Sequence, residues 1–371
     1  MLTISNVKFG AIADSKRTLP APEFDPQRQF LTFRLNEFLQ TSKTYELSMG
    51  FRGPLKNDMK GLYLSSYSHS GQTRYLATTQ FQPTDARKAF PCFDEPGFKA
   101  NFSVKIIRPK GWTSLSNMNI RETMSHGSTE EEDVYHTSPK MSTYLVAFVV
   151  SQFQSRQGTF TNGKPYLAWA QPAAYNETEE ALNVGVSIIQ KYEDFFNIEF
   201  PLPKQEMIAI PDYPLGAMEN WGLITYRETA MLYNKEISSE ASRQRVTQVI
   251  THELSHQWFG NLVTMRWWDD LWLNEGFATF IEYFGADLVH PELKMLEKFT
   301  VSEMFEAFDM DGLTTSHPIY VPVESPDQIN EIFDHIIYNK FVLKIEAAYV
   351  DCQFQRLLNY GCHSKHPQER N

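Results

Sequence analysis

The segment His252-Glu-Leu-Ser-His256 decides how the chain is interpreted, and it lies near the end of a stretch with helical spacing. A helix over residues 239–259 fits this stretch, with Ser239 as the N-cap and apolar residues recurring on one side. Residues four apart share a helix face, so both imidazoles can reach one metal ion. Glu253 is close enough to touch a water bound to that ion. Because paired histidines also occur by chance on solvent-exposed helices, the metal interpretation needs a third ligand.

Glu275 supplies that ligand at the beginning of a second expected helix, residues 274–283. The segment Trp267-Trp-Asp-Asp-Leu-Trp272 lies between the two helices and is expected to pack them together. Three protein ligands leave the fourth position of a tetrahedral zinc ion to water. The sequence therefore predicts one Zn²⁺ ion per chain, held by His252, His256 and Glu275.

Glu282 lies two turns further along the same expected helix. Two interpretations of its carboxylate stay open. It can accept a hydrogen bond from the ring N–H of a ligand histidine, or it can belong to an ordinary salt bridge.

The first part of the chain has the patterns of a β-domain, and the part after Gly158 has mostly helical spacing. In the first part, apolar and polar residues alternate or form continuous apolar runs, both typical of strands. A β-domain is thus expected to precede an α-rich domain, in the α+β class. The expected strands cover residues 31–35, 45–49, 102–106, 144–150 and 222–226, and the first expected helix covers residues 179–196.

Composition disfavours some classes of function. The chain has 371 residues, 34 Lys and Arg against 45 Asp and Glu, and a formal net charge of −11, which speaks against nucleic-acid binding. No apolar run reaches the ~18 residues of a membrane span, and no signal-peptide pattern opens the chain.

Of three cysteines, Cys92 is expected to be a buried free thiol. The acidic run at residues 130–133 is expected to be a solvated loop.

Two sets of residues resemble a known family. Residues 252–261 with residues 272–277 are similar to the zinc segments of the gluzincin aminopeptidases, and Gly216-Ala-Met-Glu-Asn220 is similar to that family's exopeptidase motif. The resemblance implies a β-rich, sandwich-like N-terminal domain followed by a thermolysin-like zinc metallopeptidase domain with an incomplete helical lobe. The expected limits are residues 1–155, 156–340 and a divergent tail over 341–371, in a chain truncated at both ends relative to the family.

In this family the exopeptidase motif binds the amino-terminal end of the substrate. The resemblance implies that Glu219 binds the free α-ammonium of the peptide. It also implies that the backbone of Gly216, Ala217 and Met218 lines the peptide like a neighbouring strand, with Asn220 completing the motif. A fixed carboxylate in a closed cleft selects a terminal ammonium over an internal amide.

Catalytic roles follow from the same resemblance. Glu253 would move the proton of the attacking water, and Tyr338 would donate a hydrogen bond to the developing oxyanion. Gln80 and Gln82 would reach the cleft near the first substrate residue. The glutamine at Gln82 is similar to the membrane aminopeptidase N branch, because some relatives carry a glutamate there.

The sequence therefore predicts a zinc aminopeptidase acting on peptides with a free N-terminus. Leu215 precedes the exopeptidase motif, so neutral first residues are expected to be preferred. Two alternatives stay open: a catalytically impaired, peptide-binding or decoy isoform, and an epoxide hydrolase on the same scaffold. The sequons at Asn101 and Asn176 favour a membrane glycoprotein facing the extracellular space, against a cytoplasmic location. A homodimer of the full-length parent is also left open.

Overall fold

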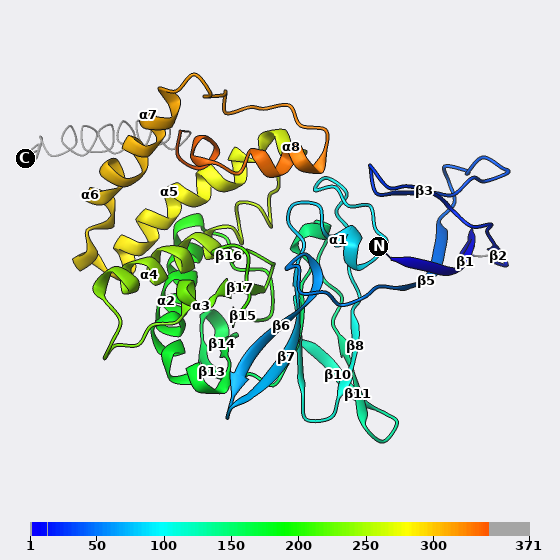
Figure 1. Ribbon diagram of the computed structural model, residues 1–371, viewed down its shortest axis with the longest axis horizontal. Coiled ribbons are helices and arrows are strands. Elements are labelled where there is room, and N and C mark those ends of the chain that lie inside the picture. The colour runs from blue at the N-terminus through cyan, green and yellow to red at the C-terminus, as the bar shows by residue number, and fades with distance from the viewer. Residues whose placement is uncertain (1, 13, 341–371) are drawn as a thin grey trace, which may run out of the picture. The chain divides into compact units, whose positions relative to one another are not determined.

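The computed structural model describes residues 2–12 and 14–340, and its chain divides into two compact units (Figure 1). Unit 1 comprises residues up to Phe153 together with Pro211–Pro214, and unit 2 comprises Gln154–Ile210 and the chain from Leu215 onward. The domain limits expected at residues 155 and 340 stay a prediction. Cys352 and Cys362, in the expected tail, lie outside the described residues. Among the described residues, no helix has both the length and the apolar character needed to cross a bilayer.

Unit 1 is built from antiparallel strands, as the sequence predicts. Its largest sheet has the order β6-β7-β12-β9, its second sheet the order β10-β11-β8, and two smaller sheets the orders β2-β1-β5 and β3-β4. The strands are β1 Thr3–Ala11, β2 Arg17–Thr18, β3 Glu23–Asp25, β4 Phe30–Thr32, β5 Tyr45–Arg52, β6 Gly61–His69, β7 Gln72–Gln80, β8 Lys105–Pro109, β9 Thr113–Ser116, β10 Ile120–His126, β11 Glu130–Tyr135 and β12 Phe148–Ser151, with helix α1 at Ala86–Ala89 and a 3₁₀ turn, η1, at Thr143–Leu145.

The β6–β7 hairpin fixes where one expected site residue lies. Ser70 and Gly71 both have positive φ angles, 51° and 75°, as the tightest two-residue hairpin turns require. The register then runs from His69 opposite Gln72 to Gly61 opposite Gln80. Gln80 therefore ends β7, where its side chain is buried.

Three sequence-based expectations in unit 1 were wrong in part. Residues 144–150 were expected to be one strand, but η1 covers Thr143–Leu145 and only residues from Phe148 onward pair as β12. An apolar run shows burial but does not distinguish a buried strand from a buried turn. Residues 102–106 contribute to β8 only from Lys105, and of residues 31–35 only the first two lie in β4.

The acidic run at residues 130–133 is a strand, not the solvated loop that its charge suggested. It forms the first part of β11, and Asp133 is fully buried there. Arg108 on the neighbouring strand β8 binds Asp133 with Nε and Nη2, and Ser114 and Thr123 donate further hydrogen bonds to it. A buried carboxylate needs such partners, and they come from strands that the run itself does not reveal.

Unit 2 contains a mixed sheet with the order β13-β14-β15-β17-β16. β14, β15 and β17 run parallel, and the outer strands β13 and β16 pair antiparallel. Every residue of β15 is buried, as in a central parallel strand covered on both faces. The strands are β13 Gln154–Thr159, β14 Pro165–Ala170, β15 Gln205–Ile210, β16 Ala217–Met218 and β17 Leu223–Arg227.

Helices make up most of the rest of unit 2. The long helices are α2 Glu179–Phe196, α4 Glu240–Ser255 and α5 Trp272–Val289. The shorter ones are α3 Glu228–Met231, α6 Met295–Phe299, α7 Phe305–Asp311 and α8 Pro326–Glu331, with turns η2 Thr161–Gly163, η3 Pro172–Thr178, η4 Trp268–Asp270, η5 Pro291–Leu293, η6 Thr300–Met304 and η7 Ile336–Lys340. The helix expected over residues 179–196 is α2, and Ser239 caps α4 by accepting from the Ser242 N–H. The helix expected to reach residue 259 ends at Ser255.

The three long helices of unit 2 pack against one another (Figure 1), and one buried tyrosine of α2 bonds to the other two. The hydroxyl of Tyr192 on α2 lies 3.1 Å from the Thr251 carbonyl of α4 and 3.0 Å from the Ile281 carbonyl of α5. Gly285 makes room for this ring, because a Cβ atom there would lie 2.1 Å from the tyrosine oxygen. Tyr192 thus fixes α4 against α5 beside the residues that the sequence singled out.

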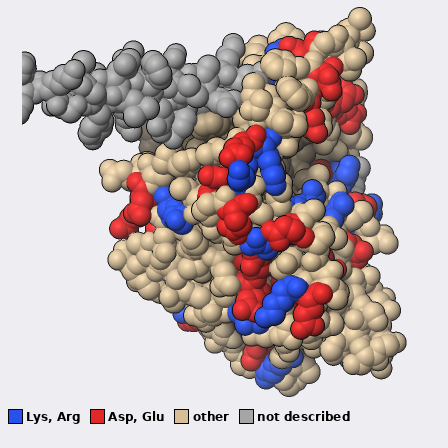
Figure 2. All heavy atoms as spheres, turned by 90° about the vertical axis from the view of Figure 1, so that its left-hand side faces the viewer, with Lys and Arg blue, Asp and Glu red and all other residues tan. Residues whose placement is uncertain are grey.

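Basic side chains lie among acidic ones on the face of the molecule shown in Figure 2. Ion pairs of this kind include Arg243 with Glu240 at 2.5 Å and with Glu292 at 3.0 Å. Paired charges of both signs leave that face without a broad basic area. The expectation that the chain does not bind nucleic acid stays a prediction.

Candidate functional site

Helices α4 and α5 bring together the three expected metal ligands. Nε2 of His252 and Nε2 of His256 lie 3.0 Å apart, and Oε2 of Glu275 lies 3.5 Å from the first and 3.3 Å from the second. In a tetrahedral zinc site, bonds of about 2.1 Å separate neighbouring ligand atoms by about 3.4 Å. The three atoms therefore have the spacing that a single zinc ion requires, and two neutral imidazoles with one carboxylate are a suitable donor set.

Both imidazoles use their other nitrogen on protein acceptors. Nδ1 of His256 lies 2.8 Å from the carbonyl of Phe259, and Nδ1 of His252 pairs with Oε2 of Glu282. A proton on Nδ1 leaves Nε2 of each ring free to face the cluster. Of the two open interpretations of Glu282, the structure shows the hydrogen bond to the histidine. Gln248 holds the second oxygen of Glu282 at 2.7 Å.

Electrostatic interactions favour an ionised carboxylate at the third ligand. Glu275 is 2% exposed. Burial opposes its ionisation, but with both imidazoles protonated, as before a metal ion binds, the charge of His256 and hydrogen bonds from both rings outweigh burial and hold the pKa of Glu275 at about 2. A charged carboxylate is the form that binds a metal ion.

The turn after α4 depends on Gly260, whose φ is +127°. A Cβ atom at this position would lie 3.2 Å from Nδ1 of His256 and 3.4 Å from the side-chain nitrogen of Asn274. Residues with a Cβ atom rarely adopt this backbone conformation. Glycine is therefore needed both for the turn and for the close approach of the backbone to His256. The turn holds the Phe259 carbonyl against the His256 ring.

Glu253 lies beside the cluster with one oxygen uncommitted. Its side chain is 6% exposed, and within residues 2–12 and 14–340 its Oε2 atom is buried without a hydrogen-bond partner. Burial, opposed by the charge of His252, raises the pKa of Glu253 to about 8. A buried oxygen without a partner is costly, and it marks the place where a proton donor from outside the chain fits.

Glu219 lies at the end of the edge strand β16 and is tied by its backbone to the residues after α4. Its carbonyl accepts from Nε2 of Gln257 at 3.2 Å and from Nδ2 of Asn261 at 2.8 Å. Gln257 also donates to the carbonyl of Glu253 at 3.1 Å and accepts from the Gly222 N–H at 3.3 Å. Gln257 and Asn261 are fully buried. Sequence reasoning gave neither residue a role, although both stand inside the quoted segment 252–261.

The rest of the exopeptidase motif follows the edge of the sheet. Ala217 and Met218 pair with β17, and the Gly216 carbonyl accepts from the Arg227 N–H at 2.9 Å. Nδ2 of Asn220 donates to the hydroxyl of Thr225 at 3.0 Å. The motif is thus an extended segment held from one side. Leu215, just before it, is 44% exposed.

Tyr338 approaches the cluster from a different part of unit 2, the turn η7. Its ring lies 6.3 Å from the His252 ring, centroid to centroid, with the ring planes 21° apart. Burial raises the pKa of the Tyr338 phenol above its usual range, and the negative charges of Glu275 and Glu219 raise it further. The phenol is therefore a protonated hydrogen-bond donor next to the expected ligands.

Gln80 and Gln82, in contrast, belong to unit 1. Both are buried, the Gln80 amide donates to the Gln82 carbonyl at 3.4 Å, and its oxygen accepts from the hydroxyl of Tyr213. Their expected contribution near the first substrate residue stays a prediction from the resemblance.

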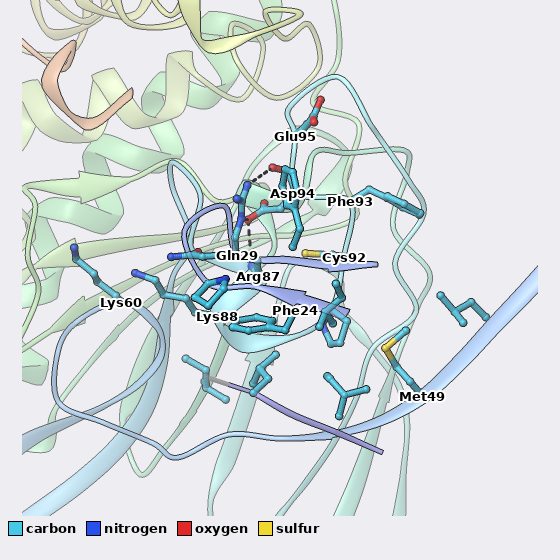
Figure 3. Close-up of a pocket in the computed structure, with 18 of the residues that line it drawn as sticks. Phe24, Gln29, Met49, Lys60, Arg87, Lys88, Cys92, Phe93, Asp94 and Glu95 are labelled. Atoms are coloured by element: carbon cyan, nitrogen blue, oxygen red, sulfur yellow. Dashed lines mark hydrogen bonds and ion pairs between the residues drawn. The ribbon is translucent and has the colours of Figure 1, made fainter. Parts of the chain in front are cut away.

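Unit 1 also contains a cavity of about 720 Å³ (Figure 3). Its lining is largely apolar and includes Cys92, a half-buried free thiol rather than the fully buried one expected. Its charged residues are partly neutralised: Nε of Arg87 lies 3.0 Å from Asp94, and Lys88 pairs with Asp85 at 2.7 Å. None of the residues predicted to form the site lines this cavity.

Comparisons with known proteins agree with these motifs. Residues 180–366 match the peptidase family M1 domain, and residues 1–145 match the peptidase M1 N-terminal domain. The chain is 46% identical to human endoplasmic reticulum aminopeptidase 1 over 316 residues, which is 85% of this chain and 34% of that protein. It is 45% identical to bovine aminopeptidase N over 336 residues, 86% of this chain and 34% of that protein. It is 44% identical to aminopeptidase A of Gloydius brevicauda over 317 residues, 85% of this chain and 33% of that protein. The chain spans about a third of the length of these relatives.

Proposed function

The chain belongs to the peptidase M1 family, and from this premise we propose that it is a zinc-dependent aminopeptidase hydrolysing the first bond of peptides with a free N-terminus. One observation carries the proposal. Two imidazole nitrogens and a carboxylate oxygen lie 3.0–3.5 Å apart, and the adjacent Glu253 has a buried oxygen with no partner among the described residues.

His252, His256 and Glu275 are the residues that would hold the zinc ion. When bound, zinc lowers the pKa of a water molecule and polarises a carbonyl group. The donor set and its spacing fit this ion, and Glu282 and the Phe259 carbonyl orient the two rings.

Glu253 serves as the proton carrier in this proposal. Its uncommitted oxygen accepts the proton of the attacking water and later gives it to the leaving amine. Tyr338 donates a hydrogen bond to the oxyanion that forms on the scissile carbonyl. The raised pKa of Tyr338 keeps this donor protonated at neutral pH.

Glu219 gives the reaction its exopeptidase character. Its buried carboxylate would bind the α-ammonium of the substrate, an interaction that an internal peptide bond cannot make. Because β16 is the last strand in its sheet, its unpaired edge can bind an extended peptide as an added strand. Gln257 and Asn261 hold the Glu219 backbone to the residues that follow His256, so the anchor and the ligands move together.

Neutral first residues are the preferred substrates in this proposal, because the half-exposed Leu215 presents an apolar side chain just before the motif. Relatives of similar identity carry the names aminopeptidase N and glutamyl aminopeptidase, so identity alone does not decide between neutral and acidic residues. A panel of aminoacyl reporters tests the preference. Fastest turnover of a glutamyl or aspartyl reporter would contradict it.

We further propose that the protein faces the extracellular space, as an ectoenzyme or a secreted enzyme. The sequon asparagines Asn101 and Asn176 are both exposed, although Nδ2 of Asn101, the atom that would carry a glycan, donates to the Ser138 carbonyl at 2.7 Å. Peptide mapping of protein from its native source should find glycans on at least one of them. Unmodified asparagines at both positions would favour the cytoplasmic alternative.

The central test compares the chain of residues 1–371 with its Glu253→Gln variant and a matched Glu297→Gln control, whose side chain is 72% exposed. All three should bind one zinc ion. Only Glu253→Gln should lose turnover of alanyl and leucyl reporters, by about 10²- to 10⁴-fold. Zinc binding without turnover by the unaltered chain would indicate a peptide-binding or decoy module, and absence of zinc from folded protein would refute the proposal.

A further inference from the structure

Tyr338 depends on a short turn for its position. η7 has five residues, and the first two, Ile336 and Ile337, are fully buried. Apolar burial holds such a turn near the core but does not fix its rotation, and a turn this short has little stability of its own. The groups that bind its backbone N–H atoms therefore contribute to where the phenol points, beside the packing of η7 on α5 and the contact of the phenol with Glu275.

Asp334 binds the N–H groups at the beginning of η7. Its Oδ1 atom accepts from the N–H of Ile336 at 3.0 Å and of Ile337 at 3.2 Å. Its main-chain carbonyl accepts from Ile337 at 3.1 Å and from the N–H of Tyr338 itself at 3.2 Å. One residue thus caps the whole turn, as an N-cap does for a longer helix.

His317, on the segment between α7 and α8, holds the other oxygen of this carboxylate. Nε2 of His317 lies 2.7 Å from Oδ2 of Asp334, and Nδ1 lies 2.7 Å from the Pro318 carbonyl. Both ring nitrogens face acceptors, so the imidazole is fixed at two points. Asp334 is therefore held from outside the turn that it caps.

Two further side chains strengthen this link between the segment and the turn. The Lys340 ammonium at the end of η7 lies 2.6 Å from Oδ1 of Asp311, and the hydroxyl of Ser316 donates to the same atom at 2.6 Å. Consecutive residues Ser316 and His317 thus connect to both ends of η7.

We propose that Asp334 and His317 are positioning residues that hold the phenol of Tyr338 in place over the cluster of His252, His256 and Glu275. This inference rests on the proposed role of Tyr338 as oxyanion donor. Neither positioning residue touches the substrate in this proposal. Their effect on the reaction passes through the tyrosine, so it falls on kcat and not on the KM of the substrate.

The test uses two variants of the full chain. Asp334→Ala removes the side-chain part of the cap and the His317 contact but keeps the main-chain carbonyl. In this variant kcat for a leucyl reporter should fall on the order of tenfold to a hundredfold with KM unchanged. Asp334→Asn keeps an oxygen for the backbone N–H groups, and its amide can donate to a neutral His317. Most of kcat should therefore be restored in Asp334→Asn.

Hydrogen exchange gives a readout that does not involve activity. The amides of Ile336 and Ile337, which the Asp334 carboxylate binds, should exchange faster in Asp334→Ala than in the unaltered chain, and Asp334→Asn should restore protection. His335→Ala is the matched control. Its side chain is 57% exposed and contacts Glu306 and, at 3.5 Å, the side-chain amide of Asn339, neither of which caps η7, so exchange at Ile336 and Ile337 and kcat should not change.

A double-variant cycle separates positioning from general damage. In a Tyr338→Phe background, Asp334→Ala should cause no further loss of kcat, because the group that it positions is already gone. An equal loss in both backgrounds would refute the positioning role, as would unchanged exchange in Asp334→Ala. If Tyr338→Phe itself kept full kcat, the proposed role of the tyrosine would be wrong, whatever the exchange result for the turn.

Discussion

Replacing Gln257 by leucine removes the side chain that joins Glu219 to the metal-ligand segment. The change keeps side-chain size roughly constant but deletes three hydrogen bonds of 3.1–3.3 Å at a fully buried position. The Glu219 carbonyl keeps its bond from Asn261, whereas the Gly222 N–H and the Glu253 carbonyl lose this partner. Each buried group left unpaired costs about 1–3 kcal/mol, so unit 2 should lose about 3 kcal/mol of unfolding free energy.

Tryptophan fluorescence is a suitable probe, because six of the seven tryptophans lie in unit 2 and only Trp112 lies in unit 1. The unfolding free energy changes by about 1–3 kcal/mol per molar urea. The midpoint of urea unfolding should therefore be lower in Gln257→Leu than in the unaltered chain, by about 1 M or more. Gln244→Leu is the same change on α4 at a half-buried position, where the side chain accepts a hydrogen bond from Lys298, and it should leave the midpoint within about 0.3 M.

Function should change selectively in Gln257→Leu. The hydrogen bonds of the Gln257 side chain go to Gly222, Glu219 and Glu253 and not to the three ligand side chains, so zinc content should stay at one ion per chain. Glu219 should bind the substrate ammonium more weakly, because its backbone has lost one of the two side chains that hold it. If the binding free energy falls by about 1.4 kcal/mol, KM should rise about tenfold. Two results would refute the reasoning that Gln257 joins Glu219 to the metal-ligand segment. One is an unchanged urea midpoint, and the other is a loss of zinc without a change in KM.

Three further predictions concern other elements. Gly260→Ala should weaken zinc binding about ten- to a hundredfold in a competition titration, because the new Cβ displaces the His256 ring; unchanged affinity would contradict this. Asp133→Ala should destabilise unit 1 by about 3 kcal/mol, followed by Trp112 fluorescence, because buried Arg108 loses its main partner. His317 has a pKa raised by its two acceptors against burial, so its stabilisation of η7 is complete below pH ~6.5 and is lost as the pH rises through the raised value. In hydrogen exchange, the protection factors of the η7 amides should therefore fall as the pH rises through the raised pKa of His317. This fall should be absent in His317→Asn.

The parts of the site that could be predicted from sequence are those that local geometry determines. His252 and His256 are four residues apart on a helix, which places both rings on one face whatever surrounds them. Ser239 begins α4, as N-cap chemistry predicts, and α2 covers Glu179–Phe196 as the apolar spacing indicates. These features need no information from the rest of the chain.

Long-range partners explain what the sequence did not reveal. Asp133 is buried because Arg108, Ser114 and Thr123 surround it, and nothing within residues 130–133 indicates those neighbours. Gln257 stood in a recognised motif, but its spacing from Glu219 carries no periodic signal. A glutamine on a helix is ordinarily a surface residue, so only the structure shows that this one is a buried link.

Glu275 and Tyr338 show how the two kinds of information combine at one site. Glu275 was predicted from the sequence itself, as a carboxylate at the start of the next helix, whereas Tyr338 was assigned by resemblance alone. Its place is set by neighbouring elements, because Tyr192 fixes α5 to α4 through two backbone carbonyls near the ligands. The backbone N–H of Tyr338 is bonded by the carbonyl of Asp334, and the side chain of Asp334 is held in turn by His317. The ligand cluster should therefore tolerate damage to the segment around His317, whereas the oxyanion donor should not, and zinc binding and turnover should separate when that segment is altered.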